Sequence, residues 1–156
     1  MQETRQIERL WTGHYRGTLH SPDSWSPSCP DICLTYAGSG AGFYGPDQMK
    51  EWCGLYPAQL HSLHPSQVAR FDNRLQRIAL TVDEARGQLT EECILSVFHH
   101  EVLDWLVPGV QPCNRQLEIP LVFSVQYADN ERLRSVRVYW DQAMVLKQIG
   151  SFQQSW

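Results

Sequence analysis

Residues 117–127 read LEIPLVFSVQY and residues 133–141 read LRSVRVYWD. Both stretches are rich in β-branched, aromatic and other apolar residues, a composition typical of strands. Asp129 and Asn130 stand between them, and this pair of residues is typical of a turn. The two stretches are therefore predicted to form an antiparallel β-hairpin.

The segments around this hairpin divide into early helices and later strands. The period of the apolar residues predicts helices over residues 5–19 and 46–55, a short strand over 32–36, strands over 75–82 and 91–100, and a closing helix over 143–149. Helices that precede a run of antiparallel strands indicate an α+β domain with the helices on one face of a curved sheet. At 156 residues the chain is expected to form a single domain, residues 1–156.

The alternation of side chains in the last strand leaves two interpretations open. Successive residues of a strand point to opposite faces. Apolar residues 136, 138 and 140 share one face, whereas Arg137, Tyr139 and Asp141 share the other. The polar face either meets solvent, as in many half-buried antiparallel strands, or lines a cavity beneath the N-terminal helices.

Composition and charge argue against nucleic acids and membranes as partners of this protein. Lys plus Arg number 13 and Asp plus Glu number 17, and a net charge of −4 gives no general attraction to nucleic acid. No apolar run is long enough to span a membrane, and the polar N-terminus does not have the pattern of a signal peptide. Five cysteines, an odd number, are expected to be free thiols in the cytoplasm.

Metal and nucleotide motifs are not complete in the sequence. His99 and His100 point to opposite faces of a regular strand, and Cys29 and Cys33 have no second pair of ligands to complete a zinc site. The glycines of GSGAGFYG, residues 38–45, are not followed by the βαβ unit of a dinucleotide site. We therefore expect neither a metal nor another cofactor.

Two stretches of the second half resemble a known family. Residues 136–150, VRVYWDQAMVLKQIG, and residues 98–133, FHHEVLDWLVPGVQPCNRQLEIPLVFSVQYADNERL, are similar to small fungal proteins of the SnoaL-like polyketide cyclase family. That family belongs to the nuclear-transport-factor-2-like superfamily. The resemblance covers Leu89 to Gly150 and implies a cone-shaped α+β barrel, in which a bent antiparallel sheet wraps around the N-terminal helices and encloses one deep pocket.

Several positions depart from the pattern of this group. Cys113, Asn114 and Arg115 stand where the group has Thr-Gly-Lys, and Glu101 follows His100 where Thr is common. With these departures the resemblance carries over the fold, whereas it does not carry over the reaction.

The resemblance also implies a set of site residues. His100 and Asp141 are the expected proton-handling pair, with Asp104 as the third catalytic candidate. A structural alternative stands beside each one, because His100 can be a core histidine, Asp104 can cap a turn and Asp141 can cap the following helix. The residues expected to bind substrate are Arg137 and Tyr139, which could hold an oxyanion, and the apolar wall Tyr36, Trp52 and Phe98.

The expected function is a cofactor-independent cyclase or isomerase that works by acid–base proton transfer. Its substrate would be a hydrophobic, oxygenated secondary metabolite, such as a polyketide, a meroterpenoid or an indole alkaloid. A semipinacol-type rearrangement or a dehydration on the same fold is one alternative, and a binding protein without chemistry is another. The expected partners are this small molecule and a second copy of the chain in a homodimer, with no nucleic acid and no membrane.

Overall fold

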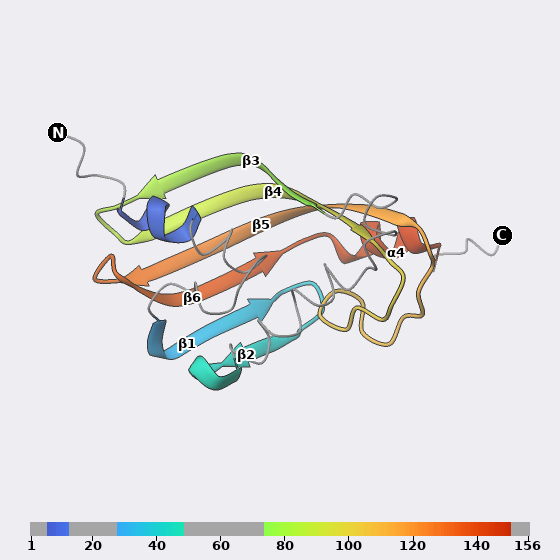
Figure 1. The fold of residues 1–156 in the computed structure, drawn as a ribbon, viewed down its shortest axis with the longest axis horizontal. Coiled ribbons are helices and arrows are strands. Elements are labelled where there is room, and N and C mark those ends of the chain that lie inside the picture. The colour runs from blue at the N-terminus through green and yellow to red at the C-terminus, as the bar shows by residue number, and fades with distance from the viewer. Residues whose placement is uncertain (1–5, 13–27, 49–73, 151–156) are drawn as a thin grey trace, which may run out of the picture.

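Six strands form one curved sheet in the computed structural model, which describes residues 6–12, 28–48 and 74–150 (Figure 1). The strands are β1 (Ser28–Tyr36), β2 (Gly42–Tyr44), β3 (Arg74–Asp83), β4 (Gln88–Phe98), β5 (Gln116–Ala128) and β6 (Arg132–Tyr139). They lie in the order β2-β1-β6-β5-β4-β3. Residues 6–12 and 45–48 are helical, and α4 (Gln142–Ile149) follows β6. The predicted α+β class is confirmed.

The β5–β6 hairpin forms as the sequence predicts. β5 pairs antiparallel with β6 from Val122 opposite Tyr139 to Ala128 opposite Arg132. Asp129 and Asn130 turn the chain with φ values of 56° and 53°, a left-handed conformation that Asn and Asp tolerate better than most residues. Asn130 also donates a hydrogen bond of 2.8 Å from its side-chain amide to the carbonyl oxygen of Glu84.

The sheet is mixed, and the expectation of a purely antiparallel sheet is wrong. β1 pairs parallel with β6, with Leu34 opposite Val136 and Tyr36 opposite Val138. The other neighbouring strands run antiparallel. Period-two patterns predict where strands lie, but strand direction depends on which distant segments become neighbours, so local sequence did not reveal this pairing.

The element boundaries differ from the predicted ones in a few places. The strand predicted over 91–100 begins three residues earlier, at Gln88, and ends at Phe98. The closing helix is confirmed over 142–149. β2 was not predicted, because it is only three residues long and lies within a glycine-rich stretch. Of the two predicted N-terminal helices, residues 6–12 and 46–48 are helical, and the remaining predicted residues up to 19 and 55 lie outside the described part.

One face of the sheet carries the core, and we call it the inner face. On β4 its apolar residues are Leu89, Cys93, Leu95 and Val97, each at most 2% exposed. The 6–12 helix packs on this face through Ile7 and Trp11, which are likewise buried, and the ring of Trp11 meets Phe123 edge-on at 5.7 Å. The N-terminal helix therefore covers the part of the inner face formed by β4 and β5.

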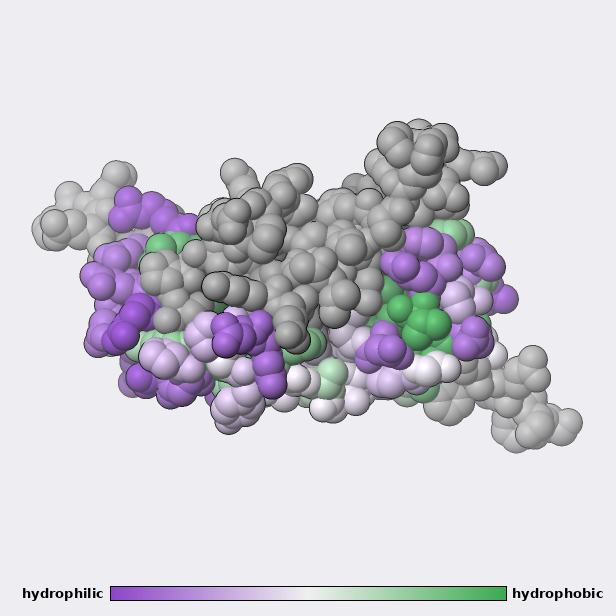
Figure 2. All heavy atoms as spheres, turned by 60° about the horizontal axis from the view of Figure 1, so that its bottom comes forward, coloured by the Kyte–Doolittle hydropathy of each residue, from purple (hydrophilic) through white to green (hydrophobic). Residues whose placement is uncertain are grey.

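The surface view shows mostly hydrophilic side chains among the coloured residues. A compact hydrophobic patch, bordered by hydrophilic residues, lies toward the end of the molecule that carries α4 (Figure 2). Among the described residues, no helix has the length and apolar character needed to cross a bilayer.

Candidate active site

A β-bulge in β3 brings Arg77 onto the inner face. Arg77 lies opposite Cys93 of β4, and Leu80 lies opposite Glu91, with a shift of register between them. Residues 77 and 80 would point to opposite faces of a regular strand, so the extra residue is what allows both to face inward. Ile78, in the bulge, is 55% exposed.

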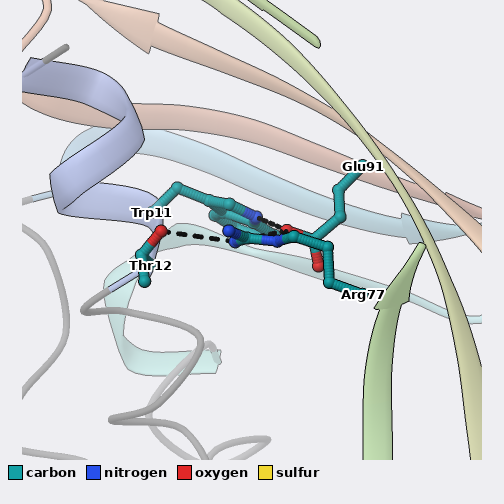
Figure 3. A network of polar contacts seen from close by, with 4 residues as sticks. All are labelled: Trp11, Thr12, Arg77 and Glu91. Carbon is teal, nitrogen blue, oxygen red and sulfur yellow. Dashed lines mark hydrogen bonds and ion pairs between the residues drawn. The ribbon is translucent and has the colours of Figure 1, made fainter. Parts of the chain in front are cut away.

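Glu91 is an acidic side chain on the inner face, near the start of β4 and beside the edge strand β3 (Figure 3). It is 0% exposed. Its Oε2 atom accepts hydrogen bonds from the indole Nε1 of Trp11 at 3.0 Å and from Nε of Arg77 at 2.9 Å. Nη2 of Arg77 completes an ion pair with the same oxygen at 2.7 Å and donates to the hydroxyl of Thr12 at 3.3 Å. Three donors from two elements thus converge on one carboxylate oxygen.

The second oxygen of this carboxylate, Oε1, does not share these hydrogen bonds. Oε1 of Glu91 is buried and has no hydrogen-bond partner among the residues that the structure describes. A buried polar atom without a hydrogen bond costs free energy, commonly about 1–3 kcal/mol, and such atoms are few in native proteins. Oε1 is therefore an acceptor that can receive a proton or a hydrogen bond from a bound molecule.

Cys93 is close to this carboxylate on β4, and its thiol is also shielded from solvent. Burial, reinforced by the negative charge of Glu91 and partly opposed by Arg77, raises the pKa of the Cys93 thiol to about 12. At neutral pH this side chain is a protonated thiol. It packs in the site as a small apolar group and is not a nucleophile.

The predicted catalytic residues do not come together. Asp141 is exposed and caps α4, because its Oδ1 accepts the backbone N–H of Met144 at 3.2 Å. Asp104 is also exposed and accepts the backbone N–H of Gly109 at 2.9 Å. His100 is half-buried, and no hydrogen bond or ion pair between described residues joins it to Asp141. Asp141 and Asp104 thus take the capping roles that were their structural alternatives.

The predicted binding residues divide between the two faces of the sheet. Arg137 and Tyr139 are exposed on the outer face, opposite to the buried Val136 and Val138, so the interpretation of the polar face as solvent-facing is correct. Phe98 likewise alternates with the buried Val97 and stacks on His100 at 6.2 Å. These three residues were expected to meet substrate, and the strand alternation places them away from the inner face.

Tyr36 is the predicted wall residue that the structure places on the inner face. It is 2% exposed and its ring lies 5.4 Å from that of Trp105 and 5.7 Å from that of Trp140. Phe43 of β2 meets it edge-on at 6.5 Å. Trp52 lies outside the described residues.

Comparison with solved structures shows relatives of the same shape. A protein from Jannaschia sp. CCS1 described as a SnoaL-like polyketide cyclase has a TM-score of 0.68 at 15% identity, over 98% of this chain and 97% of its own. A protein from Acidithiobacillus ferrooxidans described as a polyketide cyclase has a TM-score of 0.64 at 15% identity, over 98% and 100%. The chain has the SnoaL-like fold.

A third relative with this fold is an epoxide hydrolase/cyclase-like enzyme of pyran ring formation in the polyether salinomycin. It has a TM-score of 0.64 at 10% identity, over 92% of this chain and 96% of its own. No protein-family model matches the chain, and the comparison with curated proteins gives no match. At these identities the likeness establishes the SnoaL-like fold and assigns no role to any residue.

One feature of the sequence could have pointed to the cluster formed by Glu91, Arg77, Trp11 and Thr12. Glu91 shares the parity of Cys93, Leu95 and Val97, so a strand with an apolar inner face carries one acidic residue on that face. An acidic residue in such a position needs a cationic partner, because an isolated buried charge is costly. The partner itself could not be located from the sequence, since the bulge that turns Arg77 inward depends on how β3 pairs with β4.

Proposed function

We propose that this protein is a cofactor-independent cyclase or isomerase in which Glu91 transfers the proton. The proposal is supported by the difference between the two carboxylate oxygens of Glu91. Three donors contact Oε2, whereas the buried Oε1 has none among the described residues. A catalytic base needs a free lone pair and a fixed orientation, and Glu91 has both. Glu91 replaces Asp141 as the proposed proton-handling residue.

The chemistry follows from the environment of Oε1. A positioned acid–base group contributes about 10²- to 10⁴-fold to reaction rates. Oε1 would take a proton from one carbon or oxygen of the ligand and return it to another. The bonding electrons shift within the ligand, so the product is an isomer and no co-reactant is needed.

Arg77 would keep its positive charge beside the carboxylate throughout this cycle. Its guanidinium lies 2.7 Å from Oε2, and its side chain is 32% exposed. When Glu91 accepts the proton the ligand becomes anionic, and the charge of Arg77 then compensates an enolate or alkoxide. An apolar substrate with a carbonyl or hydroxyl group fits this arrangement, because the surrounding inner face is apolar.

The proposed substrate class is a hydrophobic, oxygenated secondary metabolite. Support comes from the SnoaL-like fold, since solved structures that share it are described as polyketide cyclases or act in polyether ring formation. A polyketide, a meroterpenoid and a prenylated indole alkaloid all combine an apolar skeleton with acidic C–H or O–H groups. A ring closure and a double-bond shift are both proton transfers of the proposed kind.

A structural role for Glu91 is the competing interpretation. The donors on Oε2 include Trp11 of the 6–12 helix, and a second bond from the backbone N–H of Ile7 to Oε1 of Glu84, at 3.2 Å, also fastens this helix to the sheet. An anchor of this kind would work equally well in a binding protein. The two interpretations differ in what they require of Oε1, because an anchor gains nothing from a bare oxygen.

Proton transfer can be tested in heavy water with a matched pair of variants. The protein would be incubated in D₂O with a panel of polycyclic β-diketones, hydroxy ketones and prenylated indoles, and the products separated by chromatography and mass spectrometry. The expected product has the formula of its substrate apart from incorporated deuterium. Glu91→Gln should lower its formation at least 100-fold, whereas Glu92→Gln, on the exposed face of the same strand, should retain it.

Circular dichroism would confirm that both variants fold. If folded Glu91→Gln forms the isomer as fast as the parent protein, Glu91 is an anchor and the proposed function is wrong. Compounds that bind and return unchanged in every case would identify a binding protein.

A further inference from the structure

His99 is a second buried polar side chain, and the Glu91 chemistry does not use it. It follows β4 directly and is 0% exposed. Its backbone is held on both sides, because its N–H donates to the carbonyl oxygen of Arg115 and its carbonyl accepts from the N–H of Asn114, each at 2.9 Å. Asn114 has a φ of 53°, which fits its place where the resembling group has glycine. The position of the imidazole is therefore fixed by the fold.

The contacts of Nδ1 determine where the proton of this imidazole resides. The backbone N–H of Cys113 points at Nδ1 across 3.3 Å, and the Cys113 sulfur lies 3.4 Å from the same atom. A backbone N–H can only donate, so Nδ1 must offer its lone pair to it. If Nδ1 carried the proton instead, the N–H of Cys113 would lose this acceptor. The neutral ring therefore carries its proton on Nε2.

Nε2 has no partner for that proton. The atom is buried and makes no hydrogen bond with any residue in the described part of the chain. The neighbours on the same face are apolar, with Val97 two residues before it and Leu117, opposite Val97 on β5, both 0% exposed. A donor left unsatisfied in such surroundings costs about 1–3 kcal/mol, and in a native protein it calls for a partner.

The charge state of His99 restricts what that partner can be. Burial, together with the neighbouring His100, lowers the pKa of His99, so the ring is neutral at physiological pH. An anion bound to a neutral imidazole would lose its hydration without gaining an opposite charge. An uncharged oxygen does not have this large desolvation cost. An uncharged oxygen acceptor, such as the oxygen of a carbonyl, therefore matches this donor.

We propose that Nε2–H of His99 is the polar contact of a binding site for the carbonyl oxygen of an uncharged small molecule. The site is separate from Glu91. The two residues are eight positions apart, which corresponds to roughly 26 Å of extended chain at about 3.3 Å per residue. One small ligand cannot reach both groups, so this inference does not depend on the proposed function.

Nuclear magnetic resonance of the whole chain, labelled with ¹⁵N at histidine, tests the proposal in two steps. The nitrogen shifts of the free protein should show a neutral His99 with its proton on Nε2, and a His99→Gln variant assigns the resonance by its loss. Cyclohexanone, added as the probe, should then shift the Nε2–H resonance in a saturable manner. Methylcyclohexane has similar size and no acceptor, and should leave it unchanged.

His100, half-buried and stacked on Phe98, serves as the internal control because it should respond to neither probe. A proton on Nδ1 would overturn the proposal, as would a saturated Nε2–H signal that ignores cyclohexanone, which indicates a trapped water. An equal response to both probes would show apolar binding without the hydrogen bond, and would also overturn it. Glu91→Gln should not alter the result, so failure here is distinguishable from failure of the Glu91 mechanism.

Discussion

Neighbouring residues on β4 and directly after it have opposite environments. Glu91 is fully buried beside an exposed Glu92, and His99 is fully buried beside a half-buried His100. The polarity of a residue type does not decide between such neighbours, because only the face of the strand does. The resemblance selected His100, one residue away from the histidine that points into the core.

Replacing Arg77 tests how strongly the buried carboxylate depends on its cation. Arg77→Met should lower the free energy of unfolding by about 3 kcal/mol, because Glu91 would keep only the Trp11 bond in dry surroundings. Arg86→Met is the matched control, since Arg86 pairs with Asp83 at 3.1 Å while 77% exposed and should change stability by less than about 1 kcal/mol. Urea titration measures both. Equal losses would show that the Glu91 pair is as weak as a surface pair.

His99 should make the fold sensitive to acid. Its pKa is lowered in the folded protein, first by burial and then by His100, whereas in the unfolded chain it titrates near 6.5. Below that pH the unfolded chain binds the proton more readily than the native protein, so the stability that His99 provides is present above about pH 6.5 and is lost as pH falls. Urea titrations at pH 8 to 5 should therefore show a shallower decline for His99→Gln than for the parent protein. Parallel declines would contradict this.

The bulge of β3 and the two ends of α4 each place a particular residue in a structural role. The bulge in β3 turns Arg77 toward Glu91, and the N-terminus of α4 uses Asp141 as its cap. α4 ends at Ile149 and is capped by Gly150, whose φ of 87° suits a residue without a side chain and whose N–H donates to the carbonyls of Leu146 and Lys147. Polar residues at such positions satisfy backbone groups, and capping accounts for the position of Asp141 without a catalytic role.

Substitution of Asp141 separates capping from catalysis. Asp141→Ala should lower the free energy of unfolding by about 1 kcal/mol, because the N–H of Met144 loses its acceptor. Asp141→Asn should retain most of that stability, since Asn caps helices as well as Asp does. Both variants should form the isomeric product as fast as the parent in the D₂O assay. A folded Asp141→Asn variant without turnover would return Asp141 to the catalytic centre.

The molecule as a whole buries one face of its sheet and leaves apolar groups on the other. On the outer face Val122 is half-buried opposite Tyr139, which is 42% exposed, and the next row holds Ile94 and Pro120. Glu92 flanks this patch on β4 and Arg137 flanks it on β6, so a two-fold axis could bring opposite charges together. We expect this face to pair with a second copy of the chain.

Sedimentation velocity provides the test of this association. The parent protein should have twice the mass of the chain, and Val122→Lys should shift it to a monomer by burying an unpaired charge in the interface. Tyr44→Lys, on β2 at the edge of the sheet and 72% exposed, should remain a dimer. A monomeric parent, or a Val122→Lys variant that still forms dimers, would contradict the pairing.

Local sequence predicted much of the fold and little of the site. The β5–β6 hairpin, its Asp129-Asn130 turn and the closing helix are confirmed, because each depends on interactions among residues close in the chain. Asp141 and Asp104 accept capping hydrogen bonds in the structure, and the sequence could not separate this role from catalysis because both favour the same residue type. Trp11, Arg77 and Glu91 come from three separate elements, so no local pattern could bring them together.

The amino-acid sequence by itself determined where most of the strands lie, which face of each strand is apolar, and that His99 and His100 differ in their surroundings. Those properties follow from the periods of helix and strand, which are local. The tertiary structure alone decided that β1 joins β6 in parallel, that a bulge turns Arg77 inward, and that Glu91 and His99 keep one polar atom each without a partner among the described residues. Such features depend on which distant segments become neighbours, and burial gives them their energetic weight because only in a dry interior is an unpaired polar atom costly.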